Sequence, residues 1–229
     1  MAVLSVAEVA LLQRLPRQHH IFDYSIPPNL QGQIKSGDLV EISFRKKNTF
    51  GIVTELKSHS SFSKKIKSLD KLVVSNFVSP TQLKLSRQVA GHYGVTWGAA
   101  LNLCIPHLPN KNFIPDLSNF KIPKIKPIKP VIIPLSNQIE HLQTVLSLIK
   151  KVLTRQQQVL LLVPEINLIK KWHDVLQPLY STITYSADLS TIKQRKSWLA
   201  ANSSKTKIII GTRGAIFLPF INFSKPCKI

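Results

Sequence analysis

The sequence is poor in the residues that build disulfide scaffolds and zinc sites. Only two cysteines, Cys104 and Cys227, occur in 229 residues. They form no CxxC pair, and no histidine stands at zinc-ligand spacing from either of them. The sequence therefore predicts neither a structural zinc site nor a disulfide framework, and no metal ligand is assigned. The absence of a disulfide framework fits a reducing compartment, so we expect a cytoplasmic protein.

Long apolar runs are also missing. No stretch of about 18 apolar residues occurs, so the sequence predicts no membrane-spanning helix. The first residues have no basic segment ahead of their apolar part and do not have the pattern of a signal peptide: MAVLSVAEVALLQRLP. Hydrophobic residues nevertheless make up 44% of the chain, which is enough to form a core.

Acidic residues are scarce. The chain has 11 Asp and Glu against 31 Lys and Arg, for a net charge of +20. The excess is spread out, because residues 1–110 carry 13 basic and 6 acidic side chains and residues 131–229 carry 13 and 4. Such a field attracts polyanions and favours a nucleic-acid partner. The alternative is a solvated, lysine-rich surface with no such partner.

The first 106 residues have the pattern of a small β-rich domain. Residues 3–12 suit a strand, and residues 39–44 and 50–56 form a predicted hairpin joined by a turn at 45–48. A further strand is expected at 71–77. From Ser79 apolar residues recur at helical spacing, which predicts one or two helices that end before Pro106.

Residues 107–130 are rich in proline and lysine and lack periodicity, so we interpret them as an extended linker. An α/β rhythm follows over residues 131–229. Apolar runs at 131–133, 159–163, 182–185 and 207–210 alternate with the segments expected to be helical, which are 137–153 (capped by Ser136 or Asn137), 165–179 and 191–201. The run at 159–163 is continuous, as in a parallel strand buried on both faces. The expected fold class is therefore α+β followed by a parallel α/β lobe.

Three ordered motifs carry a family resemblance. The first is HIFDYSIP at 20–27, and the second is GDLVEISF at 37–44 followed by GIV at 51–53. The third is LLVPEI at 161–166 with GTRGAIF at 211–217 and PF at 219–220. Together they resemble the PriA family of replication-restart helicases (primosomal protein N′) over residues 1–106 and about 157–223. The resemblance implies an N-terminal 3′ DNA-binding domain and part of a RecA-like first helicase lobe.

In that family the first domain captures the 3′ end of a nascent strand at a stalled fork. The resemblance assigns this role to Phe22 and Asp23 of the FDY segment, with Tyr24 and Phe44 beside them. An aromatic face stacks on any base, for about 1–3 kcal/mol. A carboxylate accepts from a base N–H or a terminal hydroxyl but not from an internal phosphodiester, so it selects an end. The alternative is that Phe22 belongs to the core and Asp23 forms a turn.

Two basic residues complete the predicted 3′-end site. The family has a glycine after the strand's phenylalanine, where the backbone approaches the ligand; this chain has Arg45, which can bind a phosphate instead. A family lysine corresponds to Lys67, with Lys64 and Lys65 as rival positions. Each of these side chains could also be a solvated surface cation.

The lobe departs from the helicase pattern. An ATP-binding lobe needs Gly-x-x-x-x-Gly-Lys-Ser/Thr between its first strand and helix. Residues 133–139 occupy that place and contain neither glycine nor lysine. The acidic pair that holds Mg²⁺ and the zinc-binding cysteines of the family have no counterpart either. We therefore expect no catalytic residues, no ATPase activity, and neither ATP nor zinc as a cofactor.

Two segments of the lobe correspond to loops that touch the DNA backbone in such helicases. Loop amides at a helix start and an arginine suit phosphate contacts. They could equally be relics of the fold, and Trp172 and Trp198 are expected in the core. The candidate backbone contacts are Pro164, Glu165, Gly211, Thr212 and Arg213.

The charge, the motifs and the missing ATP-binding pattern together predict a DNA-binding protein of the primosome type. It would recognise the 3′ end of a nascent strand at a fork without hydrolysing ATP. One alternative is a remnant or split subunit of an ATP-dependent 3′–5′ helicase. Another is a protein-interaction module for single-strand-binding protein or primosome subunits. RNA binding through the β-rich domain is a third, weaker alternative.

Overall fold

We describe a computed structural model of the chain, covering residues 5–13, 15–16, 21–60, 62, 66–105, 132–134 and 137–220. The chain divides into two compact units, residues 1–119 and 120–229. The boundary falls within the segment predicted to be a linker, whose residues 107–130 lie outside the described part. No helix among the described residues is long and apolar enough to cross a membrane.

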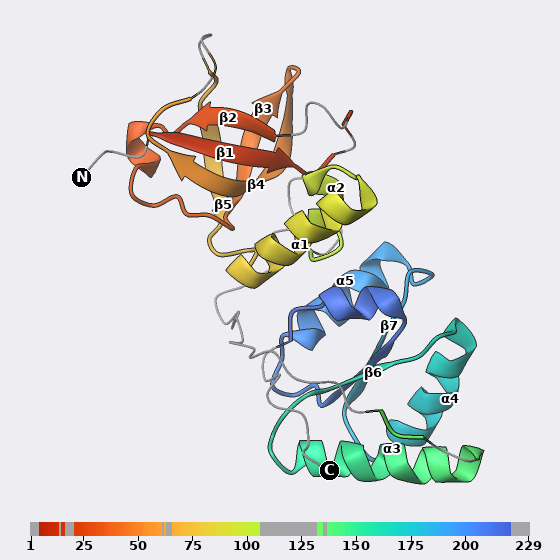
Figure 1. The fold of residues 1–229 in the computed structure, drawn as a ribbon. Helices are drawn as coiled ribbons and strands as arrows, with labels where there is room; N and C mark the ends of the chain where they lie inside the picture. Colours follow the sequence, from red (N-terminus) through yellow and green to blue (C-terminus); the bar gives the residue numbers. More distant parts are fainter. Residues whose placement is uncertain are drawn as a thin grey trace. The chain divides into compact units, whose positions relative to one another are not determined.

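The first unit contains an antiparallel five-stranded sheet and two helices (Figure 1). The strand order is β2-β1-β4-β3-β5. The elements are β1 (Val6–Leu11), β2 (Ile21–Ser25), the short 3₁₀ helix η1 (Pro28–Leu30), β3 (Leu39–Phe44), β4 (Lys47–Lys57), β5 (Leu69–Val74), α1 (Pro80–Tyr93) and α2 (Trp97–Leu101). The observed sheet and helices confirm the expected α+β class for this unit.

The two ends of the sheet meet. The Ser25 amide donates to the Lys67 carbonyl over 2.8 Å, and Ser25 forms a parallel bridge with Ser68, just before β5. The first and last strands in the sheet order are therefore joined at one rim. Alternate residues of the strands point inward and form a core of aliphatic side chains with Tyr24: Ala7, Val9, Leu11, Tyr24, Ile26, Ile34, Val40, Ile42, Val53 and Leu69.

Helix caps, a buried aspartate and a glycine hold the turns and helices of this unit in place. Ser79 caps α1 in a capping box with Gln82, and Gly94 ends the helix in a left-handed conformation. The Asp38 carboxylate accepts hydrogen bonds from the backbone amides of Lys35 and Asn76, each with a donor–acceptor distance of 2.7 Å. These bonds hold the turn before β3 against the segment after β5. Gly98 lets α2 approach β1, because a Cβ there would lie 1.7 Å from the Leu11 carbonyl oxygen.

The hairpin between β3 and β4 is tighter than the sequence predicts. The expected turn at 45–48 is only two residues long, because Lys47 and Asn48 continue the ladder opposite Phe44 and Ser43. Arg45 and Lys46 both have positive φ, 48° and 64°. A two-residue hairpin needs this backbone to match the twist of the strands, and it usually recruits glycine or asparagine.

The second unit is a three-stranded parallel sheet in the order β6-β8-β7 with three helices (Figure 1). This arrangement agrees with the expected partial α/β lobe. The elements are α3 (Gln138–Leu153), β6 (Val159–Leu162), α4 (Ile166–Leu176), β7 (Thr182–Tyr185), α5 (Thr191–Ala201), β8 (Ile208–Gly211) and the 3₁₀ helix η2 (Arg213–Phe217).

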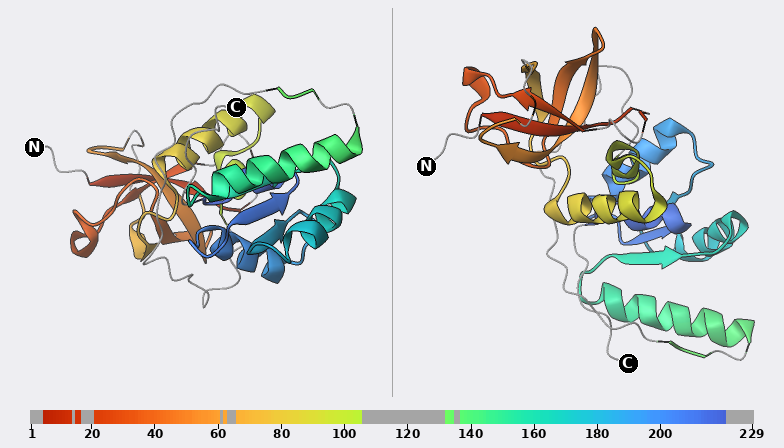
Figure 2. Two further views of the ribbon diagram at one scale, coloured as in Figure 1. Left: turned by 90° about the horizontal axis from the view of Figure 1, so that it is seen from below. Right: turned by 45° about the horizontal axis from the view of Figure 1, so that its top comes forward.

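The helices cover both faces of this sheet (Figures 1 and 2). Residues of α3 and α4, including Ile149, Ile169 and Leu176, pack with Ile208 and Ile210 of β8 in one cluster. Trp198 of α5 is fully buried and lies in the core, as expected. Trp172 of α4 is partly buried against the α3–α4 cluster. The caps of α3 and α5 are Asn137 and Ser190, whose side chains accept from amides of the first turn.

Two expectations for the lobe are wrong. Residues 132–134, expected near the first strand, form no strand, and the Ile132 side chain is 90% exposed. The run at 159–163 is also not buried on both faces, because β6 is an edge strand and Leu162 is 45% exposed. The fully buried strand is β8, which lies between β6 and β7 and donates and accepts hydrogen bonds on both sides.

Candidate nucleic-acid interface

A cavity of about 250 Å³ opens near the rim where β2 approaches the segment before β5. We call it the aromatic cavity. Its walls come from β2, from the end of β3 with the turn that follows, and from the residue before Ser68. The lining residues are Phe22, Asp23, Tyr24, Ser43, Phe44, Arg45 and Lys67. The structure thus brings together all six residues that the sequence assigns to a 3′-end site, and adds Ser43.

Aromatic rings form the apolar part of this cavity. The rings of Phe22 and Phe44 lie 4.9 Å apart between centroids at an angle of 55°. The Arg45 guanidinium lies 5.4 Å from the centroid of the Phe44 ring, within cation–π range. Both phenylalanines are only half-buried, so part of their surface is open to a ligand. This arrangement can stack on a base and present a cation beside it.

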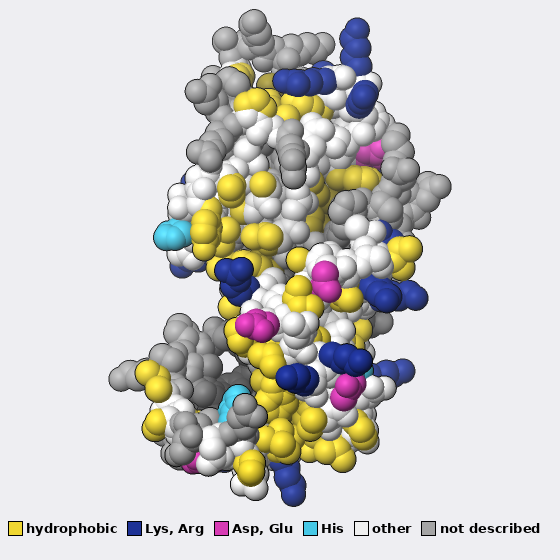
Figure 3. Space-filling model, turned by 90° about the vertical axis from the view of Figure 1, so that its right-hand side faces the viewer, with side chains coloured by type: hydrophobic (Ala, Val, Ile, Leu, Met, Phe, Trp, Pro, Cys, Tyr) yellow, Lys and Arg dark blue, Asp and Glu magenta, His cyan; other side chains and the backbone are white. Residues whose placement is uncertain are grey.

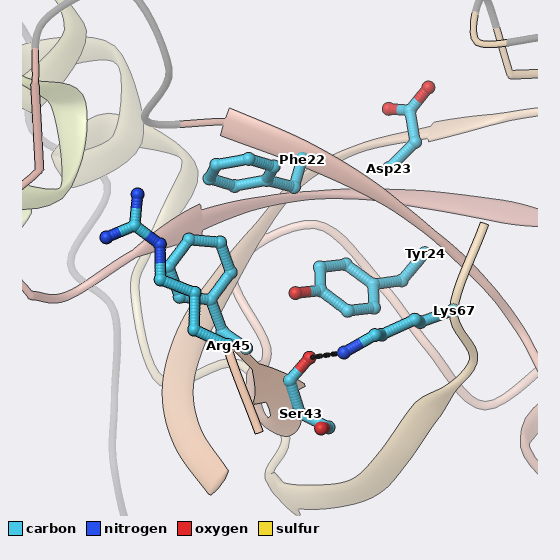
Figure 4. A pocket seen from close by; sticks show the side chains of 7 residues that line it. Phe22, Asp23, Tyr24, Ser43, Arg45 and Lys67 are labelled. Atoms are coloured by element: carbon cyan, nitrogen blue, oxygen red, sulfur yellow. Dashed lines mark hydrogen bonds between the residues drawn. The ribbon is translucent and has the colours of Figure 1, made fainter. Parts of the chain in front are cut away.

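Tyr24 lies deeper than the phenylalanines. Phe22 and Tyr24 are two residues apart on β2 and therefore share a face. Figure 4 shows the Tyr24 ring directed into the cavity. The side chain is buried, and burial, with the charge of Asp70 as the second cause, raises the pKa of its hydroxyl to about 12. The phenol is thus a neutral hydrogen-bonding group at neutral pH.

Asp23 lies on the opposite face of β2 from Phe22 and Tyr24. Its carboxylate points away from the side chains that fill the cavity (Figure 4). It accepts from the Ser60 hydroxyl over 2.7 Å and pairs with the Lys57 ammonium at 3.4 Å. Lys57 also binds Glu8, so one cation serves two carboxylates. The Asp23 side chain is only 3% exposed. Its predicted contact with a nucleotide stays a prediction, and here the carboxylate is already held by protein groups.

The two basic side chains of the cavity are both exposed. The Lys67 ammonium lies 3.5 Å from the Ser43 carbonyl oxygen, which leaves most of its hydrogen-bonding capacity free for an anion (Figure 4). Arg45 has a positive φ of 48°, a backbone conformation that favours glycine. The rival positions Lys64 and Lys65 lie outside the described residues.

A second cavity, of about 480 Å³, adjoins the first. We call it the polar cavity. It shares Ser43 and Lys67 with the aromatic cavity, and its lining residues are Ser25, Ser43, Ile66, Lys67, Ser68 and Asp70. The sequence assigned no role to Asp70 or to the serines, although Ser25 and Ser43 lie within the HIFDYSIP and GDLVEISF motifs. The lining residues of β5 and of the end of β2 come together only when the sheet closes.

The predicted backbone-contact residues of the lobe gather at the carboxyl ends of two neighbouring strands. Leu162 of β6 pairs with Gly211 of β8, and the Val163 amide donates to the Gly211 carbonyl over 2.9 Å. Pro164 and Glu165 follow β6, and Glu165 is the N-cap residue of α4 without a side-chain cap. Thr212 and Arg213 follow β8. Pro164, Glu165 and Arg213 are exposed, and of their side chains the Arg213 guanidinium suits contact with a phosphate backbone.

Among the described residues, no group of three or more His, Cys, Asp or Glu side chains could hold a metal ion. On the face drawn in Figure 3, Lys and Arg side chains are scattered over both units.

Comparison with protein families identifies the unit that holds both cavities. The family model for the 3′ DNA-binding domain (3′BD) of PriA matches residues 8–106. Residues 8–106 are thus similar to the 3′BD of PriA. The 3′BD contains every residue that lines the two cavities. The resemblance inferred from the FDY and GDLVEISF motifs is thereby confirmed.

Curated relatives extend the similarity beyond the 3′BD. The chain is 29% identical to the replication restart protein PriA of Rickettsia conorii over 222 residues, which is 87% of this chain and 34% of that protein. It is 25% identical to the same-named protein of Helicobacter pylori over 207 residues, covering 82% of this chain and 32% of that protein. The chain thus spans about a third of the length of these curated relatives.

Proposed function

We propose that the 3′BD of this chain binds the 3′ end of a DNA strand at a replication fork, with the terminal base in the aromatic cavity. The observation that carries the proposal is the meeting of Phe22, Phe44, Arg45 and Lys67 around one opening, in a domain of this family. The half-buried rings supply a sequence-tolerant stacking surface. Lys67 and Arg45 supply charge for the adjoining phosphate.

Fluorescence anisotropy tests the proposal on a fork whose leading strand ends in a free 3′-hydroxyl. The same fork ending in a 3′-phosphate is the comparison. We expect the hydroxyl end to bind more tightly, and Phe22→Ala to weaken that binding by about tenfold, since stacking is worth about 1–3 kcal/mol. Equal affinity for both ends would contradict 3′-end recognition and leave only non-specific DNA binding.

The role of Lys67, one of the two basic side chains at the aromatic cavity, can be tested separately. Lys67→Ala should weaken binding and lower the slope of log affinity against log salt concentration by about one, because one phosphate contact is lost. Lys84→Ala is the matched control, since Lys84 is an exposed lysine on α1 that lines neither cavity. An equal effect of both substitutions would mean that charge alone, and not the cavity, determines binding.

We also propose that the lobe adds non-specific backbone contacts through Arg213 and its neighbours and does not hydrolyse ATP. The proposal is supported by the exposure of Arg213 and by the lack of glycine and lysine in residues 133–139. Arg213→Ala should reduce affinity equally for 3′-hydroxyl and 3′-phosphate forks. ATP turnover stimulated by forked DNA would refute the second half of the proposal and favour a helicase subunit.

The chain's fork-associated partners would include proteins as well as DNA. The net charge of +20 suits acidic segments such as those of single-strand-binding protein or primosome subunits. The anisotropy experiment distinguishes DNA-end binding from docking of a protein partner. A protein-docking module would bind such a partner with the Phe22→Ala substitution in place and show no preference among DNA ends.

A further inference from the structure

Asp70 occupies an irregular point of strand β5. Along the β3–β5 ladder, Ile42 pairs with Leu69 and Glu41 pairs with Lys71, so Asp70 has no partner residue on β3. This is a β-bulge, with two residues of β5 opposing one of β3. The inward–outward alternation fails here, since Asp70 and Lys71 are both exposed after the buried Leu69. Bulges at the rims of closed sheets commonly re-aim a side chain toward a site.

The bulge places Asp70 at the polar cavity. That cavity adjoins the aromatic cavity, and Lys67 and Ser43 belong to the walls of both. The described residues form two ion pairs, Lys57 with Glu8 and Lys57 with Asp23, and Asp70 takes part in neither. Burial raises the pKa of Tyr24 first, and the charge of Asp70 is the second cause, in keeping with the place of Asp70 beside the adjoining cavity.

Asp23, which lines the aromatic cavity, and Asp70, which lines the polar cavity, differ in burial and in hydrogen bonding. Asp23 is almost fully buried and accepts from Ser60 and Lys57. Asp70 is exposed, and it shares its cavity with the hydroxyl-bearing side chains of Ser25, Ser43 and Ser68. A sugar edge offers hydroxyl donors and ether acceptors, which suit such a lining. A volume of about 480 Å³ lies within the ordinary range for small-ligand pockets.

We propose that the polar cavity holds the terminal sugar of the bound strand and that Asp70 accepts a hydrogen bond from its free 3′-hydroxyl. The proposal rests on the function proposed above, with the base in the aromatic cavity and Lys67 beside the phosphate. A free hydroxyl donates to the carboxylate. A 3′-phosphate or a continuing strand would instead bring negative charge against it. Asp70, and not Asp23, is then the residue that selects a strand end.

The test compares forks that end in 3′-hydroxyl, 3′-deoxy (dideoxy-terminated) and 3′-phosphate, each with the wild-type chain, Asp70→Ala and Asp70→Asn. The wild type should bind the hydroxyl end best. Asp70→Ala should lose about tenfold on the hydroxyl end and little on the deoxy end, because a charge-assisted hydrogen bond disappears. Asp70→Asn should tighten binding of the phosphate end, because the amide carries no charge. Glu55→Gln is the matched control, since it removes one exposed carboxylate from β4 outside both cavities.

The outcomes separate the two proposals. If the wild-type chain binds all three ends equally, 3′-end recognition itself fails. If the wild type prefers the hydroxyl end and Asp70→Ala keeps that preference in full, end recognition stands and the role of Asp70 is refuted. An equal effect of Glu55→Gln would also refute it, because general charge would then explain the change. Loss of the preference in Asp23→Asn but not in Asp70→Ala would transfer the role to Asp23.

Discussion

Lys57→Met gives the sharpest test of how the 3′BD holds β2 in place. The Lys57 ammonium binds Glu8 on β1 and Asp23 on β2, whose side chains are 17% and 3% exposed. The substitution leaves Asp23 buried with only the Ser60 hydroxyl as its described hydrogen-bond donor. Removing one partner of a buried pair costs about 3–5 kcal/mol. Lys57 is itself 30% exposed, so solvent screens part of this, and we expect a loss of about 2 kcal/mol in unfolding free energy.

A buried thiol provides the assay. Cys104 is fully buried in the first unit, and burial raises its pKa to about 12, so its thiol reacts only when that unit opens. In a Cys227→Ser background, the labelling rate of Cys104 by a thiol reagent in mild urea reports the open fraction. A loss of about 2 kcal/mol should raise that rate roughly 30-fold. Lys84→Met, at an exposed position of α1, is the matched control and should leave the rate unchanged.

The double variant Lys57→Met/Asp23→Asn decides the cause. A neutral amide costs less to bury than an unpaired carboxylate, so the double variant should recover at least half of the lost stability. An unchanged labelling rate in Lys57→Met, or no recovery in the double variant, would refute the reasoning. The pH dependence has a definite sign. The hydrogen bond that the Lys57 ammonium donates to Glu8 raises the pKa of Lys57 despite partial burial, so the stabilisation is present below pH 10.5 and is lost as pH rises through the raised value.

Three further predictions concern single groups of the 3′BD. Asp38→Ala should cost about 3 kcal/mol in urea denaturation, because two amides bound over 2.7 Å lose their acceptor, and a cost under about 1 kcal/mol would contradict this. Phenol absorbance should show Tyr24 titrating near pH 12, with its stabilising contribution lost between pH 10 and 12, and Asp70→Asn should lower that pKa. An unchanged midpoint would show that Asp70 does not act on the phenol. Gly98→Ala should destabilise the unit by about 1–3 kcal/mol, since the new methyl meets the Leu11 carbonyl, and a wild-type melting temperature would contradict that packing.

The sequence predicts regular elements well where local signals agree. The strand at 182–185 and the helix at 191–201 match the structure residue for residue. In the structure the helix begins after Ser190, whose side chain caps it, so a local signal marks its first residue. The turn after Phe44 was harder to predict. Nothing in Arg45-Lys46-Lys47-Asn48 indicates that two non-glycine residues adopt positive φ, because the ladder of β3 and β4 imposes that backbone.

Some residues of the candidate site could likewise be predicted from the sequence, and others depend on how the strands pair. The resemblance singled out Phe22, Tyr24 and Lys67, and the structure places all three around one opening, while their role in binding stays a prediction. The orientation of Asp23 follows from strand alternation, which places it opposite Phe22, yet its partners Lys57 and Ser60 come from a distant part of the chain. Asp70 could not be found at all, because a bulge depends on strand register, and register is a property of the paired strands.

The joining of Ser25 to Lys67 and Ser68 has a consequence for how the unit behaves in a crowded cell. An open sheet presents unpaired amides and carbonyls along its edge strands and can recruit a second chain into aggregates. Here the end of β2 is occupied by the chain's own backbone, through the 2.8 Å bond and the parallel bridge. Both cavities border that junction. The junction therefore leaves fewer unpaired backbone groups at this rim for a second chain to pair with.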